Sequence, residues 1–430
     1  MILRTELSRG IILKLSNHPL VQTFLGLRGN PRACVITEPM WGLSMNLCMP
    51  YASVYMLALG MTDTQVGIVA SIYMFSQMFF ALISGMVVDK MGRRLSTAVF
   101  DFLAWSLPCL IWMSSQGFWF FAVAALFNGM MKITTVSWDC LMVEDAPPDK
   151  ITHIYTWVII CGNLSALFAP IASILVSRLT LIPAVRILYI NAFVIMTAKL
   201  LILYKLSTET RVGVQRREAA KGRSWKSMLS GYGESWRGIR KSNGTSFAII
   251  ISVLVEIVGM ISVTFWQIIA SRRIGLPDSL LPIFPMIKSV MSIAFLFGVL
   301  GRMNQKKLRL PLFGGFGCGI IGCLLLIAAP GTRVMGIVVL LLSLLFESFG
   351  NATLNTLRES LVAIHVRPED RSGIMALLQT IVMLVSVPFG YIGGVLSDIS
   401  KPLPFVLSIG LLVAGLALTA FVYRDEPLQN

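Results

Sequence analysis

Gly85-Met-Val-Val-Asp89-Lys90-Met-Gly92-Arg93-Arg94 is a short charged segment that lies between two long apolar runs. Its first glycine allows two helices to approach closely, and its second allows a turn at low steric cost. Asp89 can accept hydrogen bonds from the free amides of a neighbouring helix N-terminus. The three basic residues favour the side of a membrane that retains positive charge. The segment therefore predicts a turn between two membrane helices that joins two helix bundles together.

The composition independently indicates a membrane protein. Hydrophobic residues make up 56% of the 430-residue chain and charged residues 13%, which is too little polar surface to cover the core of a soluble protein. In lipid every backbone amide must be paired within its own helix or barrel. The apolar runs have the length of helices and lack the alternation of barrel strands. We therefore expect an all-α membrane protein.

Each crossing needs about 20 apolar residues, and on that basis the sequence predicts twelve spans in two sets of six. Their expected ranges are 33–59, 65–88, 95–115, 118–143, 153–177, 183–205, 246–270, 282–301, 310–329, 334–362, 372–397 and 402–423. This predicts five parts: an N-terminal interfacial segment 1–32, a six-helix bundle 33–205, a cytoplasmic linker 206–245, a second six-helix bundle 246–424 and a tail 425–430.

The distribution of basic residues predicts the orientation. The chain has 36 Lys and Arg against 21 Asp and Glu. If the N-terminus is cytoplasmic, most of the basic residues fall in segments on that side, and the other side holds only Arg178, Arg186, Arg272, Arg273, Arg333 and Lys401. This asymmetry predicts a multi-pass protein of the cell membrane with both termini in the cytoplasm. The basic linker is expected to contact lipid headgroups, and no nucleic-acid partner is expected.

Motifs for other classes of protein are missing from the sequence. It contains no nucleophile motif, Walker A loop or nucleotide fingerprint, so an enzyme is not expected. The seven cysteines fall in apolar runs without a CxxC pair, and only three histidines are present. Neither a disulfide framework nor a metal site is therefore expected.

The quoted segment fits the pattern G-x-x-x-D-[RK]-x-G-[RK]-[RK], and through it the chain resembles the major facilitator superfamily. A weak internal repeat agrees, because Pro147-Pro148-Asp149-Lys150 corresponds to Pro368-Glu369-Asp370-Arg371 in the second half. The resemblance implies two pseudo-symmetric six-helix bundles that move a small molecule by alternating access. It also implies that spans one, four, seven and ten line a central cavity. We expect a monomer.

Ionisable side chains inside the predicted spans are the first candidates for the site, because each costs at least about 2.5 kcal/mol at membrane depth. Lys132, Glu256 and Glu347 lie near the middle of their spans, and Lys288 lies nearer the outer side. The resemblance implies that the first three point into the cavity. A fixed Lys–Glu pair across the bundle interface is the structural alternative. Side chains that are also candidates for substrate contact, or for helix packing, are Asn46, Asn351 and Trp266.

A second group lies nearer the cytoplasmic ends of the spans and includes Arg358. Arg93 or Arg94 is expected to pair with Asp139 or Glu144 across the cytoplasmic mouth. The expected gating motif therefore consists of Gly85, Asp89, Lys90, Gly92, Arg93, Arg94, Asp139 and Glu144.

These observations predict a secondary transporter of a small organic solute. A buried carboxyl group that gains and loses a proton in each cycle would couple transport to protons, with no other cofactor. The intact charged segment favours export. The alternatives are an ion-independent facilitator or nutrient importer of the same fold, or a non-transporting member that acts as a sensor or handles lipids.

Overall fold

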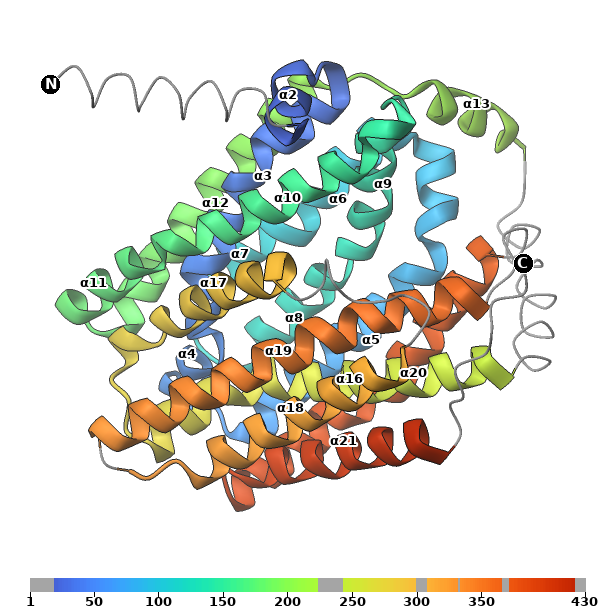
Figure 1. The fold of residues 1–430 in the computed structure, drawn as a ribbon. Helices are drawn as coiled ribbons and strands as arrows, with labels where there is room; N and C mark the ends of the chain where they lie inside the picture. The colour runs from blue at the N-terminus through green and yellow to red at the C-terminus, as the bar shows by residue number, and fades with distance from the viewer. Residues whose placement is uncertain (1–18, 223–242, 299–307, 332, 366–370, 422–430) are drawn as a thin grey trace, which may run out of the picture.

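The computed structural model describes residues 19–222, 243–298, 308–331, 333–365 and 371–421 (Figure 1). Every regular element within these ranges is helical. Most of the predicted N-terminal segment, the linker residues 223–242 and the predicted tail lie outside the described residues. The part boundaries predicted from the sequence therefore remain predictions.

Prolines interrupt two of the spans in the first half. A 3-10 turn at Met49–Tyr51 contains Pro50, and another 3-10 turn ends just before Pro170. The elements of this half are α2 (Pro19–Gly26), α3 (Gly29–Cys48), η1 (Met49–Tyr51), α4 (Ala52–Ala58), α5 (Asp63–Met91), α6 (Arg93–Asp101), η2 (Phe102–Ser106), α7 (Leu107–Met113), α8 (Phe118–Gly129), α9 (Met131–Val143), η3 (Pro148–Lys150), α10 (Ile151–Ser165), η4 (Ala166–Phe168), α11 (Ala169–Leu179) and α12 (Leu181–Leu206).

The second half repeats this arrangement with fewer interruptions. The short helix α13 (Arg211–Ala219) opens the predicted linker and packs near α5. The elements that follow are α16 (Asn243–Ile268), η5 (Ile269–Arg273), η6 (Asp278–Leu280), α17 (Ile283–Gly298), α18 (Arg309–Ala328), α19 (Arg333–His365), α20 (Arg371–Ile399) and α21 (Leu403–Phe421).

Ten helical segments of the described residues are long and apolar enough to cross a membrane. The other two predicted spans correspond to 29–58, which the turn at Met49–Tyr51 interrupts, and to Ile283–Gly298, which is described over 16 residues. Large apolar side chains lie on the outside of the helices, among them Trp119 at 76% exposure and Leu201 at 61%. Such a surface suits lipid because it would be unstable in water.

The two halves meet where α5 crosses α20 (Figure 1). Glycines allow the two backbones to touch: a Cβ on Gly67 would lie 2.2 Å from the Gly390 carbonyl oxygen, and one on Gly394 would lie 2.7 Å from the Asp63 carbonyl oxygen. Ser71 Oγ donates to the Val387 carbonyl at 2.6 Å. Close contact of this kind is what small residues permit between membrane helices.

Polar side chains hold the halves together at the end of α5 that lies opposite the charged segment. The Asp398 carboxylate accepts the backbone amides of Asp63 and Thr64 at 3.1 and 2.9 Å, and so caps the start of α5. Asp63 in turn pairs with Lys401 at 2.7 Å. Here Asp63 and Asp398 link the first residues of α5 to the last residues of α20.

Gly85 does not have the packing role expected from the sequence. It is exposed on α5, and a Cβ placed on it would meet no atom of the described residues within 4 Å. The glycines that allow close helix approach on α5 lie near its other end, at Gly67.

Candidate functional site

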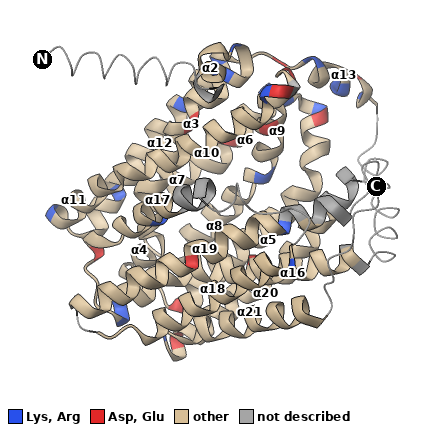
Figure 2. Ribbon diagram, in the orientation of Figure 1, with Lys and Arg blue, Asp and Glu red and all other residues tan. Residues whose placement is uncertain are grey.

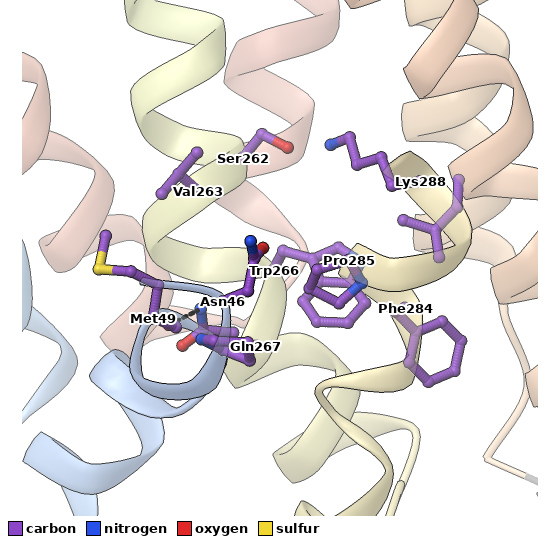
Figure 3. Close-up of a pocket in the computed structure, with 11 residues that line it drawn as sticks. Asn46, Met49, Ser262, Val263, Trp266, Gln267, Phe284, Pro285 and Lys288 are labelled. Carbon is purple, nitrogen blue, oxygen red and sulfur yellow. Dashed lines mark hydrogen bonds between the residues drawn. The ribbon is translucent and has the colours of Figure 1, made fainter. Parts of the chain in front are cut away.

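A pocket lies between α3–η1 of the first half and α16, α17 and α19 of the second (Figure 3). Its empty space, including the open mouth, is about 680 Å³. The predicted candidates Asn46, Trp266 and Lys288 line it. The other lining residues are Met49, Pro50, Ser262, Val263, Gln267, Phe284, Pro285 and Leu344.

An ion pair lies at the edge of this pocket. Lys288 Nζ lies 3.0 Å from Glu347 Oε1, which also accepts hydrogen bonds from the Ser262 hydroxyl and, at 3.4 Å, from Asn351 Nδ2. The pair joins α17 to α19 within the second half, so it is not the fixed pair across the bundle interface that the sequence left open. Three polar side chains, those of Lys288, Ser262 and Asn351, thus converge on one carboxylate oxygen.

Lys132 and Glu256 belong to a separate cluster and do not line the pocket. Arg358 Nη1 donates to Glu256 Oε2 at 2.8 Å, and both side chains are about a quarter to a third exposed, at 26% and 31%. The charges of Glu256 and Arg358 also act on Lys132 of α9, which belongs to the other half. Arg358, which the sequence predicts in the cytoplasmic group, instead pairs with Glu256.

The pocket floor is fixed by an amide that links the two halves. Gln267 Nε2 donates to the Met49 carbonyl at 2.9 Å, while its Oε1 accepts from the Ser53 amide at 3.1 Å. Asn46 Nδ2 is used within its own helix, where it donates to the Gly42 carbonyl at 2.8 Å. The Met49 carbonyl belongs to the 3-10 turn at η1, where it also accepts the Ala52 amide.

The charged segment between α5 and α6 is held by an arginine at its centre. Arg93 is buried, and its guanidinium donates to Asp89 at 2.9 Å and to Glu144 at 3.1 Å. Glu144 also accepts from the Thr210 hydroxyl. Arg93 therefore contacts Glu144 rather than Asp139, and all of these contacts lie within the first half and the start of the linker. Figure 2 shows basic and acidic residues gathered at this end, around α6, α9 and α13.

Glu209 fills the role that the sequence analysis assigned to Asp89. Its carboxylate accepts the backbone amides of Arg93 at 2.8 Å and Arg94 at 3.1 Å, and thus caps the start of α6. Arg94 Nη2 donates to the Tyr204 carbonyl at 2.6 Å and lies over the Tyr204 ring. The loop is therefore joined to the chain that follows α12, a contact that no local pattern near residue 90 predicts.

A buried ionic cluster inside the first half escaped the sequence analysis. Lys199 Nζ of α12 lies 2.5 Å from Asp101 Oδ2 of α6, and the two side chains are 5% and 4% exposed. Glu38 of α3 is also buried, and the charges of Lys199 and Asp101 act on it. The signal was present in the sequence, since Asp101 and Lys199 are ionisable residues within predicted spans three and six.

The two glycines of the charged segment are expected to respond in opposite ways to alanine. Gly92 has φ 89° and ψ 163°, and a Cβ on it would lie 2.6 Å from Glu209 Oε2. Gly92→Ala should therefore lower the free energy of unfolding by about 1–3 kcal/mol. Gly85→Ala, which adds a methyl group in open space on a helix, should leave it unchanged or slightly raised. Chemical unfolding in detergent checks both, and equal losses would contradict the assigned role of Gly92.

Comparison with known proteins shows the family. A profile of the Major Facilitator Superfamily matches residues 40–387. A search of curated proteins found no match. Three similar solved structures are too distant in sequence to show more than the fold. A variant of the nucleoside transporter NupG has a TM-score of 0.74 and 15% identity, over 92% of this chain and 100% of that chain. The human organic anion transporter MFSD10 has a TM-score of 0.63 and 16% identity, over 94% and 100% of the two chains, and a POT family transporter in complex with 5-aminolevulinic acid has a TM-score of 0.66 and 14% identity, over 91% and 95%.

The match covers most of the chain and includes both the charged segment of α5–α6 and the helices that form the pocket. The protein is thus a multi-pass membrane transporter of small solutes, not an enzyme, and it belongs to the Major Facilitator Superfamily.

Proposed function

We propose that this transporter couples the movement of a small organic solute to protons through Glu347 and Lys288, with the pocket beside them as the solute site. The observation that carries the proposal is the position of the Glu347 carboxylate. Glu347 is 8% exposed as a whole residue, and its carboxylate lies behind the pocket wall. The carboxylate accepts a hydrogen bond from the one ammonium group among the described residues that line the pocket.

Protonation of Glu347 would change what Lys288 can bind. The ionised carboxylate attracts the ammonium group, and a neutral carboxyl group attracts it far less. A proton on Glu347 therefore frees Lys288 for the solute, and release of the proton returns Lys288 to Glu347 and expels the solute. In this scheme the solute and the proton travel together, which is symport. It differs from the export that the charged segment favours.

Alternating access would break and re-form the contacts between the two halves. The contacts of α5 with α20, and those of Gln267 with Met49 and Ser53, close the end opposite the charged segment. In the other state these contacts separate, and the end with the charged segment closes. We propose that this latter end is cytoplasmic, with both termini, because of the distribution of basic residues. Each monomer encloses its own pocket.

Glu347→Gln is expected to remove proton coupling and to leave exchange intact. A thermal-shift screen of metabolites and drugs on the purified protein first supplies a radiolabelled solute. In proteoliposomes, accumulation driven by a pH gradient should fall by at least about tenfold in the variant. Counterflow without a gradient should continue, because binding and reorientation do not need proton exchange.

Glu256→Gln is the matched control, since Glu256 pairs with Arg358 away from the pocket, and it should retain gradient-driven accumulation. A wild-type rate that is equal with and without a gradient would replace proton coupling by facilitated diffusion. The side of accumulation reports the direction: symport gathers solute on the alkaline side, and the antiport required for export gathers it on the acidic side.

A further inference from the structure

The described residues that line the pocket carry one charge, and it is positive. Among the described residues that line the pocket, Lys288 alone is charged, and its side chain is 33% exposed. Glu347, whose side chain is 10% exposed, lies behind it and is not one of the lining residues. A solute that enters the pocket therefore meets an ammonium group before it meets the carboxylate. This order favours an anionic group on the solute.

A second donor in the pocket has no acceptor. Trp266 lines the pocket and is 7% exposed, and its indole Nε1–H makes no hydrogen bond within the described part of the chain. A buried N–H without an acceptor is costly, and buried tryptophan usually has one. An oxygen atom of a bound solute would supply the missing acceptor. Trp266 and Lys288 both line the pocket (Figure 3).

The remaining walls suit a flat apolar body. The Trp266 and Phe284 rings lie 5.4 Å apart, centroid to centroid, with their planes at 58°. Met49 and Val263 are 47% and 61% exposed and face the pocket with Pro285. Flexible methionine and aromatic rings adapt to planar apolar ligands.

Two other solute classes fit less well. An organic cation would face the Lys288 ammonium across an apolar pocket, where repulsion between like charges is strong. A polyhydroxylated neutral solute needs many donors and acceptors, but one of the two amide N–H donors is already used in each of Gln267 and Asn46, by the Met49 and Gly42 carbonyls.

We infer that the pocket takes an amphipathic organic monoanion, with its carboxylate or other acidic group on Lys288 and Trp266 Nε1 and its aromatic body between Phe284 and Met49. This inference rests on the proposed use of the pocket as the solute site, although it does not depend on proton coupling.

The test uses matched pairs of an acid and its amide: benzoate and benzamide, 2-naphthoate and 2-naphthamide, indole-3-acetate and indole-3-acetamide. Dissociation constants are measured by calorimetry on the purified full-length protein in detergent. In at least one pair the acid is expected to bind at least about tenfold more tightly than the amide, because a charge-assisted hydrogen bond replaces a neutral one. If the amide binds as tightly as the acid in every pair, or if no acid binds, the inference is overturned.

Variants assign the preference to particular atoms. Lys288→Gln should remove the preference for the acid, and Lys288→Arg should keep it, which separates loss of charge from loss of fold. Trp266→Phe keeps an aromatic ring but removes the N–H donor. It should weaken binding of the acid several-fold, and the acid should still bind more tightly than the amide. Glu347→Gln should tighten binding of the acid, because it removes the carboxylate that competes with the acid for Lys288. A preference that survives in Lys288→Gln overturns the inference.

The outcomes also separate this inference from proton coupling. One outcome is that the preference for the acid is lost in Lys288→Gln while solute accumulation is the same with and without a pH gradient. That outcome supports the anionic solute class and contradicts proton coupling. The opposite outcome is that solute accumulation depends on the pH gradient while acids and amides bind with equal affinity. That outcome supports proton coupling and contradicts the anionic solute class.

Discussion

Replacing Lys199 by methionine is expected to lower the free energy of unfolding by about 3–5 kcal/mol, because it leaves a buried carboxylate without its ion-pair partner. Lys199 Nζ lies 2.5 Å from Asp101 Oδ2, and both side chains are almost fully buried. Asp101 Oδ1 is already buried without a hydrogen bond in the described part of the chain. Glu38 adds a further carboxyl group on which the charge of Lys199 acts, so the loss of Lys199 affects two acids. Chemical unfolding in detergent gives the value.

The double variant Lys199→Met, Asp101→Leu separates loss of the pair from loss of packing. Replacing both partners of a buried ion pair by apolar residues is often neutral or stabilising, so most of the lost stability should return. Lys205→Met is the matched control, since Lys205 is exposed near the end of the same helix α12 and should change little. A loss of less than about 1 kcal/mol in Lys199→Met would mean that the pair contributes no more than an exposed one.

The helical spans could be predicted from the sequence because a bilayer leaves few choices. An apolar run such as Leu181–Leu206 or Leu403–Phe421 must pair its amides within itself, so its hydropathy decides both its structure and its length. The turn at Gly92 could also be predicted from the sequence, because its positive φ requires glycine.

The partners of charged side chains could be predicted far less well. Position along a span gives the depth of Glu256 or Glu347, but the rotation of the helix about its axis decides what the side chain faces. Arg358 lies toward the cytoplasmic end of predicted span ten, and the helix turns it toward Glu256. Glu209 is distant in sequence from the amides that it caps, and only the folded chain brings it to Arg93 and Arg94.

Replacing Gly390 by leucine is expected to reduce transport by at least about tenfold by preventing closure of the end opposite the charged segment. A Cβ on Gly390 would lie 2.5 Å from Ser71 Oγ and 2.7 Å from the Gly67 carbonyl oxygen. Neither neighbour can yield easily, since the serine hydroxyl donates to Val387 and the carbonyl belongs to the backbone of α5. The larger side chain must hold α5 and α20 apart. Counterflow in proteoliposomes measures the loss.

The control is a glycine that makes no such contact. Gly410 of α21 is exposed, and a Cβ on it would meet no atom within 4 Å, so Gly410→Leu should transport at the wild-type rate. Gly390→Leu should still purify as a folded protein, because the alternate state of a transporter does not require closure at this end. Its thermal unfolding temperature is measured beside its transport. Wild-type counterflow in a folded Gly390→Leu protein would show that α5 and α20 need not touch during the cycle, and the contact would then be packing alone.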